Sequence, residues 1–141
     1  MADPRNTISF EGIGEERVTY LIDDDTITYD ATKTNGSAQV GLAVTLSAAR
    51  TVALVADAEA VIGKLLRVEA DDKAVVQVGG YMTLPGGTSA TLTLGTPIVG
   101  DLLDTAKGYI RSAASGAAAE LLVAKGAIMD ASVTTAVVVK F

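Results

Sequence analysis

Apolar and polar residues alternate in short stretches along most of this chain. The clearest case is residues 40–46, where Val40, Leu42, Val44 and Leu46 are separated by small or polar residues. A period of two is typical of a β-strand that buries one face. Comparable stretches, bounded by Gly, Pro, Asn and Asp, predict strands over residues 18–22, 26–29, 40–46, 65–69, 74–78, 81–84, 91–94, 98–103 and 108–111.

Turn-forming residues separate these stretches. Asn35-Gly36 tolerates positive φ and predicts a turn. The polar run Asp71-Asp72-Lys73 lies between two aliphatic stretches and predicts a hairpin, and another turn is expected near Lys107-Gly108. Residues 63–78 and 126–141 share one order: a glycine, a strand, a polar turn and a Val-rich strand. Coincidence in a Val-rich β protein explains this echo as well as duplication does, and both segments predict hairpins.

Two segments have patterns that could form a helix. In residues 47–62, Ser47 could cap a helix, and some apolar residues keep roughly helical spacing. A strand over 51–55 followed by a turn at Asp57-Ala58-Glu59 fits equally well, and we favour the strand. Residues 112–124 are rich in Ala and Leu, which are strong helix formers, so a short helix is expected from about Ser115 to Ala124.

Many short strands separated by regular turns predict a mainly β fold, namely a compact β-barrel or β-tulip-like single domain with one short helix. Residues 18–141 form the predicted domain. Residues 1–17 contain isolated apolar residues among polar ones and glycines, and they predict an extended N-terminal arm. The arm's candidate partner-binding residues are Ile8, Phe10 and Ile13. A frayed terminus without a role explains the same segment equally well.

Composition narrows the possible chemistry. The 141 residues are 49% hydrophobic but include no His, Cys or Trp. Imidazole bases, thiolate nucleophiles and the ordinary zinc and haem ligand sets are therefore absent. The glycine pairs do not have the spacing of phosphate-binding loops. We expect no enzymatic activity, no catalytic residue, no cofactor and no metal site.

Charge and hydropathy bear on partners. Seventeen acidic and eleven basic residues give a net charge of −6, which argues against nucleic-acid binding because that function needs a basic surface. No apolar run approaches the roughly 20 residues that span a bilayer. The first residues lack the apolar core of a secretory signal. We therefore expect no nucleic acid, no membrane, and synthesis in the cytoplasm.

Two local features suggest chemistry. Asp23-Asp24-Asp25 could offer oxygens to calcium, but the EF-hand spacing is missing, and a solvated turn is the favoured interpretation. Asp72-Lys73-Ala74 resembles the D-K-A tripeptide of lipoyl-attachment hairpins, which presents a lysine at the tip of a β-turn. This resemblance covers about ten residues and implies a carrier domain modified on Lys73. Ordinary turn chemistry explains an exposed lysine beside aspartate as well.

A wider resemblance starts near the stretch Gly79-Gly80-Tyr81-Met82-Thr83-Leu84-Pro85-Gly86-Gly87. Gly95-Thr96-Pro97-Ile98-Val99-Gly100 follows, then Lys107-Gly108-Tyr109-Ile110-Arg111 and the closing hairpin that begins at Gly126. This order is similar to that of the small head decoration, or cement, proteins of tailed bacteriophages. The similarity spans roughly residues 40–141.

The resemblance implies a β-barrel or β-tulip body on the outer surface of a capsid. Such proteins cluster as homotrimers, bind the major capsid protein and stabilise the shell against the pressure of the packaged DNA. The expected location is therefore the virion. An N-terminal arm that becomes ordered on the capsid is common in the family, and here it could add a strand to a neighbouring sheet edge. Another β-barrel virion adaptor, such as a head-fibre base, is an alternative beside the carrier domain.

Overall fold

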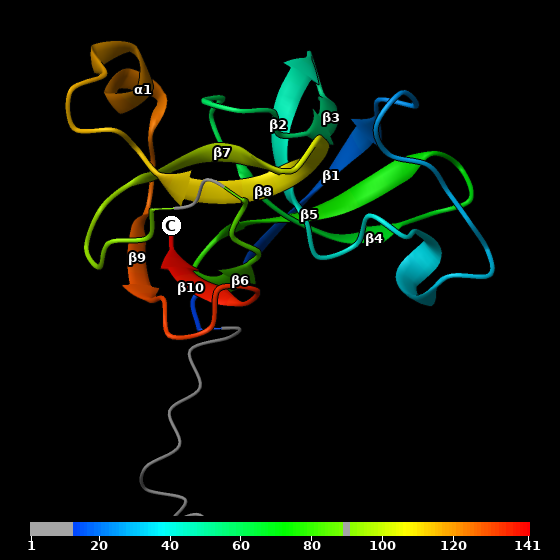
Figure 1. The fold of residues 1–141 in the computed structure, drawn as a ribbon. Helices are drawn as coiled ribbons and strands as arrows, with labels where there is room; N and C mark the ends of the chain where they lie inside the picture. Colours follow the sequence, from blue (N-terminus) through cyan, green and yellow to red (C-terminus); the bar gives the residue numbers. More distant parts are fainter. Residues whose placement is uncertain (1–12, 89–90) are drawn as a thin grey trace, which may run out of the picture.

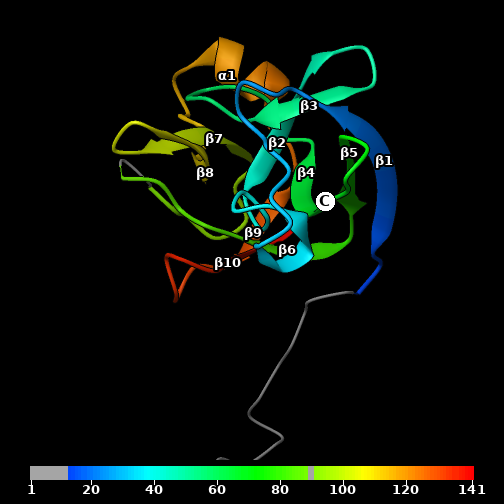
Figure 2. The ribbon, with the colours of Figure 1, turned by 90° about the vertical axis from the view of Figure 1, so that its right-hand side faces the viewer.

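A closed five-stranded β-barrel forms one half of the molecule, on the right in Figure 1. The computed structural model describes residues 13–88 and 91–141. Around the barrel the strands follow the order β1-β3-β2-β4-β5, and Figure 2 turns them toward the viewer with β1 at the right-hand edge. The barrel strands are β1 Glu16–Ile22, β2 Ala43–Ala48, β3 Thr51–Leu54, β4 Gly63–Val68 and β5 Lys73–Gly79.

Strand β1 closes the barrel because it pairs along both of its edges. It runs antiparallel to β5, with Val18 opposite Val76, and parallel to β3, with Leu21 opposite Thr51. Closure leaves no open edge to which another strand could add by accident.

Aliphatic side chains fill the barrel, as the scarcity of aromatic residues requires. Alternation along each strand directs every second side chain inward. Full burial of a Val, Leu or Ile side chain contributes about 1.5–3 kcal/mol. The buried barrel core consists of Ile22, Ile27, Val44, Val52, Leu54, Leu65, Val68, Ala74 and Val76.

The other half of the molecule contains a three-stranded sheet, in the order β6-β10-β9, and the ribbon β7-β8. Its elements are β6 Tyr81–Leu84, β7 Ile98–Leu103, β8 Ala106–Ser112, the helix α1 Ala118–Val123, β9 Ala127–Asp130 and β10 Val137–Lys140. The short 3₁₀ helix η2 (Thr34–Gly36) lies against β4 in the barrel half.

A second apolar core joins the two halves. Its buried residues are Ala43, Val55, Val61, Met82, Leu84, Ile98, Ile110, Ile128, Val137 and Val139. Ala43 comes from barrel strand β2, whereas Met82 and Val139 come from the three-stranded sheet. The buried Gln77 side chain also links the halves, because its amide nitrogen donates to the Tyr81 carbonyl at 3.0 Å.

Most sequence predictions of strand and turn are confirmed. Within residues 13–88 and 91–141, the mainly β class, the barrel and one short α-helix are all present. Residues 51–54 form a strand rather than a helix, and the hairpin around Asp71-Asp72-Lys73 is β4-β5. The Asn35-Gly36 turn has the expected positive φ angles, 56° and 83°. Segments 63–78 and 126–141 both contain antiparallel strand pairs, β4-β5 and β9-β10.

The strand predicted over 26–29 is wrong. The amides of Thr26 and Ile27 both donate to the Asp23 carbonyl, so the chain turns there instead of extending. Thr26 Oγ1 accepts a hydrogen bond from the Leu54 amide at 3.0 Å, and the Ile27 side chain is fully buried in the barrel core. Ile27 therefore fills part of the barrel core from a loop. The apolar Ile27 between the polar residues Thr26 and Thr28 looks like strand alternation, but it reflects one buried loop side chain.

Predictions near the β7-β8 ribbon also need correction. Residues 91–94 are not a strand. The Thr91 carbonyl accepts from the Ser112 amide and the Thr93 amide donates to Ser112 Oγ, but these two bonds do not form a β-ladder. The ribbon turns at 104–105, not near Lys107-Gly108. Gly108 lies inside β8, where a side chain would collide with Leu42. The helix is shorter than predicted, and strand β2 begins at Ala43 rather than near residue 40.

Candidate functional site

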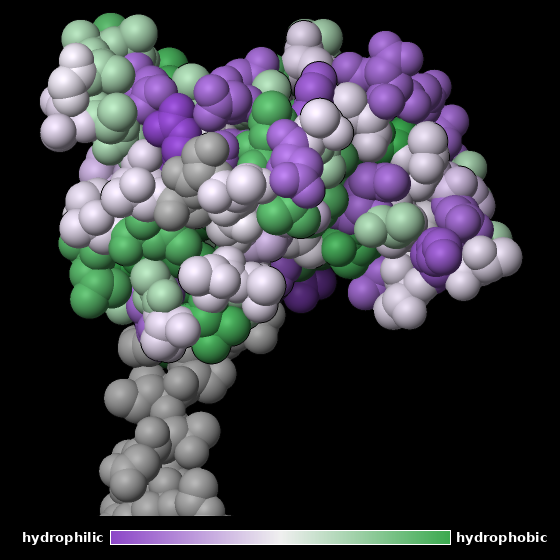
Figure 3. All heavy atoms as spheres, viewed as in Figure 1, coloured by the Kyte–Doolittle hydropathy of each residue, from purple (hydrophilic) through white to green (hydrophobic). Residues whose placement is uncertain are grey.

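Helix α1 has no buried residue. Leu121, Leu122 and Val123 follow one another, and their exposed fractions are 46%, 86% and 36%. We call residues 113–124, which include this helix, the α1 protrusion. Figure 1 shows α1 projecting from the body at the upper left, and Figure 3 shows pale green, apolar atoms gathered there. A run of exposed aliphatic residues is unusual unless it serves an interaction.

One charged contact ties the α1 protrusion to the body. The Arg111 guanidinium on β8 donates to both carboxylate oxygens of Glu120, at 3.0 and 2.5 Å. A carboxylate oxygen of Glu120 also accepts from the Ala114 amide at 2.9 Å, which fixes the loop before the helix. Both side chains are about 85% shielded from solvent. A forked, shielded pair of this kind is stronger than an ordinary surface pair.

The ionisation of this pair follows from its geometry. Hydrogen bonds from Arg111, together with the Ala114 amide, lower the pKa of Glu120 to about 2. The same contact with Glu120, helped by Asp57, raises the pKa of Arg111 further above its usual range. Asp57 lies 3.2 Å from Arg111 but is about half exposed, so its contribution is smaller. Arg111 therefore connects α1 to the ribbon.

An apolar groove opens at one mouth of the barrel. We call it the barrel-mouth groove, and its volume is about 430 Å³. It lies between the barrel and the C-terminal end of the chain and is lined by Tyr20, Leu46, Val61, Ile62, Val78, Lys125, Gly126 and Phe141. Leu46 is half exposed, although it alternates with Val44 in the buried barrel core. Among the described residues that line the groove, Lys125 is the one with a charged side chain.

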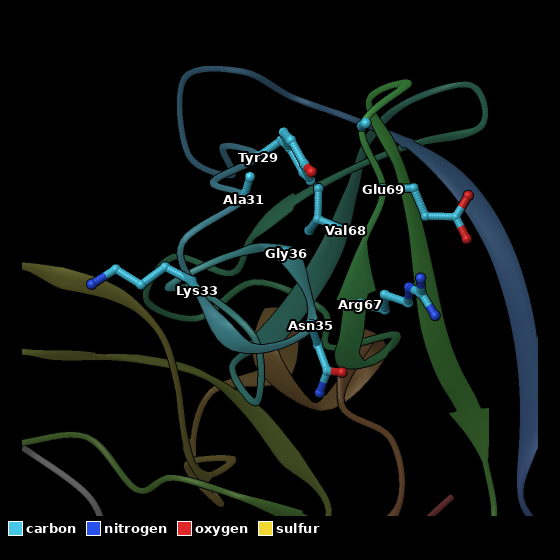
Figure 4. Close-up of a pocket in the computed structure, with 9 residues that line it drawn as sticks. Tyr29, Ala31, Lys33, Asn35, Gly36, Arg67, Val68 and Glu69 are labelled. Carbon is cyan, nitrogen blue, oxygen red and sulfur yellow. The ribbon is translucent and has the colours of Figure 1, made fainter.

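A polar pocket of about 570 Å³ lies between η2 and the end of β4 (Figure 4). Tyr29 and Val68 face each other on one side, and Lys33 points away from Arg67 and Glu69. The two cations therefore do not converge on one point. Glu69 on the same side as Arg67 opposes anion binding. We assign no ligand to this pocket.

Lys73 lies at the start of β5, directly after the hairpin tip. Its hairpin tip is formed by residues 70–72, and Lys73 is already the first residue of β5, opposite Leu21. The ammonium group lies 3.2 Å from an Asp71 carboxylate oxygen, and the side chain is half exposed. Asp72 takes the positive φ, 60°, that the turn requires. Lys73 is thus reachable by solvent but lies beside the tip instead of at it.

The acidic run at residues 23–25 forms a turn. The Asp25 amide donates to Asp23 Oδ1 at 3.0 Å, the local bond expected of an aspartate that begins a turn. Within residues 13–88 and 91–141, no group of three or more acidic side chains is arranged to hold a metal ion. Asp101 is a separate case, since it is buried and its Oδ2 has no hydrogen-bond partner among the described residues.

The predicted arm residues fall into two groups. Ile8 and Phe10 lie outside the described residues. Ile13 is described: its side chain is 54% exposed, and its carbonyl accepts a hydrogen bond from the Tyr81 amide at 2.9 Å. Strand β1 begins at Glu16, so the last two residues of the predicted arm pair with β5 in the barrel. The boundary predicted at residue 17 therefore moves toward the N-terminus.

Sequence reasoning did not predict two features of these surfaces. It identified the helix but not its exposure. The signal was present, because Leu121-Leu122-Val123 covers too wide an arc of a helix for all three residues to face one core. The barrel-mouth groove had no local signal, since its lining residues come from segments spread between Tyr20 and Phe141.

Comparisons with known proteins add no relative: no protein-family model, no curated protein and no solved structure matches the chain. In the part of the chain that the structure describes, no helix has the length and apolar character needed to cross a membrane. The function proposed below therefore rests on the geometry of these surfaces and on the sequence resemblance.

Proposed function

We propose that this protein is a non-enzymatic structural component of a tailed-phage virion that binds the outer surface of the capsid and stabilises it. The observation that supports this proposal most is the α1 protrusion. It presents Leu121, Leu122 and Val123 to solvent on a chain with a net charge of −6. An apolar surface on an otherwise charged protein favours a protein partner.

The rest of the molecule is suited to hold the α1 protrusion in place against a capsid. A closed barrel and a second core that joins both halves give a rigid support for the protrusion. The Arg111–Glu120 pair holds the protrusion at a fixed place on that support. A surface that is ordered before binding loses little conformational entropy when it binds. Many identical copies on a lattice then add their contacts to the stability of the shell.

The partners follow from the resemblance to decoration proteins. In this proposal the α1 protrusion contacts the major capsid protein or a neighbouring copy of the chain, and three copies form a homotrimer. The N-terminal residues Ile8 and Phe10 add contacts to the capsid. The location of the protein is the outer surface of the virion. An attachment role in another part of the virion would use the same surfaces.

Deletion of residues 1–12 tests the arm. The cut must end before Ile13, because the Ile13 carbonyl accepts from Tyr81 and Glu16 pairs with Gly79. The truncated protein should keep its thermal transition and bind particles more weakly than the full chain. An unchanged particle affinity with an intact thermal transition would remove the arm from the proposal.

The carrier alternative rests on the half-exposed ammonium group of Lys73 beside a hairpin tip. Carrier function requires a covalent modification at Lys73, whereas capsid binding requires none. Lys73→Arg therefore separates the two functions. The substitution should leave particle binding unchanged if the protein is a decoration protein, and it should abolish function if the protein is a carrier.

Density-gradient fractionation of a lysate from the native source, followed by mass spectrometry, tests the proposed function. Co-migration of this chain with particles of megadalton size, in many copies, is the expected result. Recovery only in fractions of small soluble proteins would contradict it. The mass of the peptide that contains Lys73 would then show whether the carrier function applies.

A further inference from the structure

We propose that the barrel-mouth groove is the docking site of the chain's own N-terminal segment, with the side chain of Phe10 seated beside Leu46 and Phe141. This inference goes beyond the proposed function and does not depend on it, because it concerns the free protein. Three observations support it: the chemistry of the groove, the place where the described chain begins, and the residues just before that place.

The groove has the chemistry of a site for an apolar side chain. Leu46, Ile62, Val78 and the Phe141 ring supply apolar walls, and the volume is about 430 Å³. Pockets of roughly 300–1,000 Å³ hold small organic groups. Half of the Leu46 side chain remains in water. Covering these walls with an apolar side chain would remove that surface from water, which favours docking.

The described chain begins beside this groove. The Ile13 carbonyl accepts from the Tyr81 amide at 2.9 Å, and Gly14 packs directly against Gly80. Gly80 in turn exchanges two backbone hydrogen bonds with Phe141, at 3.0 and 3.4 Å. The Phe141 ring lines the groove. A single residue, Gly80, therefore separates the start of the described chain from the groove wall.

The residues just before Ile13 match the groove. Phe10 is one of the two phenylalanines of the chain, and Ile8 lies two positions earlier among polar residues. Phe10 lies three positions before Ile13, and three extended residues span about 10 Å. Glu11 follows Phe10 directly, and the charged residue of the groove is Lys125, which has the opposite sign. The size and polarity of Phe10 and the charge of Glu11 therefore favour the N-terminal segment as the occupant of the groove.

Attachment in the same chain favours docking within one molecule. A short tether gives an effective concentration in the millimolar range, so a weak apolar contact is sufficient. The segment of a second copy lacks this tether and would lose free translation on binding, so it competes at a disadvantage. The same apolar residues would be withheld from other partners while they occupy the groove, and would leave it when a better surface is offered.

A single tryptophan tests the docking, because the natural chain has none. We expect Phe10→Trp to show blue-shifted emission and low quenching by acrylamide. Asn6→Trp, at a polar position of the same segment, is the matched control and should emit like an exposed indole. Adding Leu46→Glu to Phe10→Trp should abolish both the shift and the protection. Leu46 is half exposed, so we expect the barrel to tolerate the change, and circular dichroism checks this.

Each other result overturns the proposal. Emission of Phe10→Trp equal to that of Asn6→Trp would show that Phe10 is not buried. A blue shift that survives Leu46→Glu would place Phe10 somewhere other than the groove.

Disulfide formation distinguishes docking within one molecule from exchange between molecules. The chain has no native cysteine, so the pair Phe10→Cys with Leu46→Cys can form only one bridge within a chain. We expect rapid oxidation to a cross-linked monomer, and slower oxidation for the control pair of Phe10→Cys with Leu122→Cys on the protrusion. Disulfide-linked dimers as the main product would show that the groove receives a second copy's segment and would overturn the proposal. Equal oxidation rates for the two pairs would overturn it as well.

Discussion

Gly36 and Gly41 both have positive φ angles, 83° and 95°, but their surroundings differ. A side chain built on Gly36 would overlap the Val68 carbonyl oxygen, because η2 packs closely on β4. Gly41 has no atom within 4 Å of the same position. A side chain at Gly41 would therefore meet only backbone strain, whereas a side chain at Gly36 would meet the same strain and also collide with β4.

Alanine at each glycine measures the two effects. Gly41→Ala should lower the free energy of unfolding by about 1–2 kcal/mol, the penalty of a left-handed backbone with a Cβ. Gly36→Ala should lower it by about 2–5 kcal/mol, because the same penalty is joined by overpacking against a backbone atom. Urea denaturation of the two variants gives both values. Equal losses would show that η2 moves away from β4 at little cost.

The sequence predicted the structural role of some glycines and not of others. Asn35-Gly36 announces a turn because the two residue types tolerate positive φ. Gly108 looks the same in the sequence, but it lies within β8 and makes room for the Leu42 side chain. A glycine signals either a turn or a close approach, and only the tertiary neighbour decides between them. That neighbour is 66 positions away in the chain, outside any local pattern.

At the scale of elements, the loop after β1 acts as a plug for the barrel. Ile27 is fully buried there, and Thr26 accepts a hydrogen bond from the end of β3. Alternating residues predicted a strand because one inserted side chain between polar neighbours has the same pattern as a half-buried strand. The turn at Asp23, which uses its backbone carbonyl twice, leaves no such signature.

Ile27→Ala should therefore behave as a core substitution although it lies in a loop. We expect a loss of about 2–5 kcal/mol in the free energy of unfolding, the range for large-to-small changes in a core. Leu94→Ala, at a loop residue that is 65% exposed, is the control and should change stability little. A small effect of Ile27→Ala in urea denaturation would show that the barrel end is closed without this side chain.

The Arg111–Glu120 pair makes the position of α1 dependent on pH. The pKa of Glu120 is about 2 in the folded protein, against an ordinary value of 4.5. Its stabilising contribution is therefore complete above about pH 4.5 and is lost as the pH falls toward 2. Glu120→Gln should mimic the acid state at neutral pH, with several-fold faster amide hydrogen exchange over residues 113–124.

Asp57→Asn is the matched control for this prediction, because Asp57 also contacts Arg111 but is about half exposed. It should leave hydrogen exchange of the protrusion nearly unchanged. Exchange in Glu120→Gln that equals that of the natural chain would show that α1 is held by other contacts.

At the scale of the whole molecule, the mainly β class and the order of most strands followed from alternation and turns. The pairing of neighbouring strands in the predicted hairpins followed as well, but the pairing of strands distant in the chain did not. Closure of the barrel depends on β1 meeting both β3 and β5, and the second core gathers residues from Ala43 to Val139. The barrel-mouth groove and the Arg111–Glu120 contact arise only from that assembly. Sequence periodicity describes which face of a strand is buried, but it does not say against what.

The central claim is that the exposed aliphatic residues of α1 bind a large virion particle. It is tested most directly by co-sedimentation of the purified chain with particles stripped of it. The natural chain and Lys73→Arg should bind saturably, and Leu122→Glu should bind at least tenfold more weakly, since about 1.4 kcal/mol corresponds to that factor. Leu122 is 86% exposed, so the fold tolerates the charge. Absence of binding by the natural chain, or equal binding by Leu122→Glu, would contradict the claim.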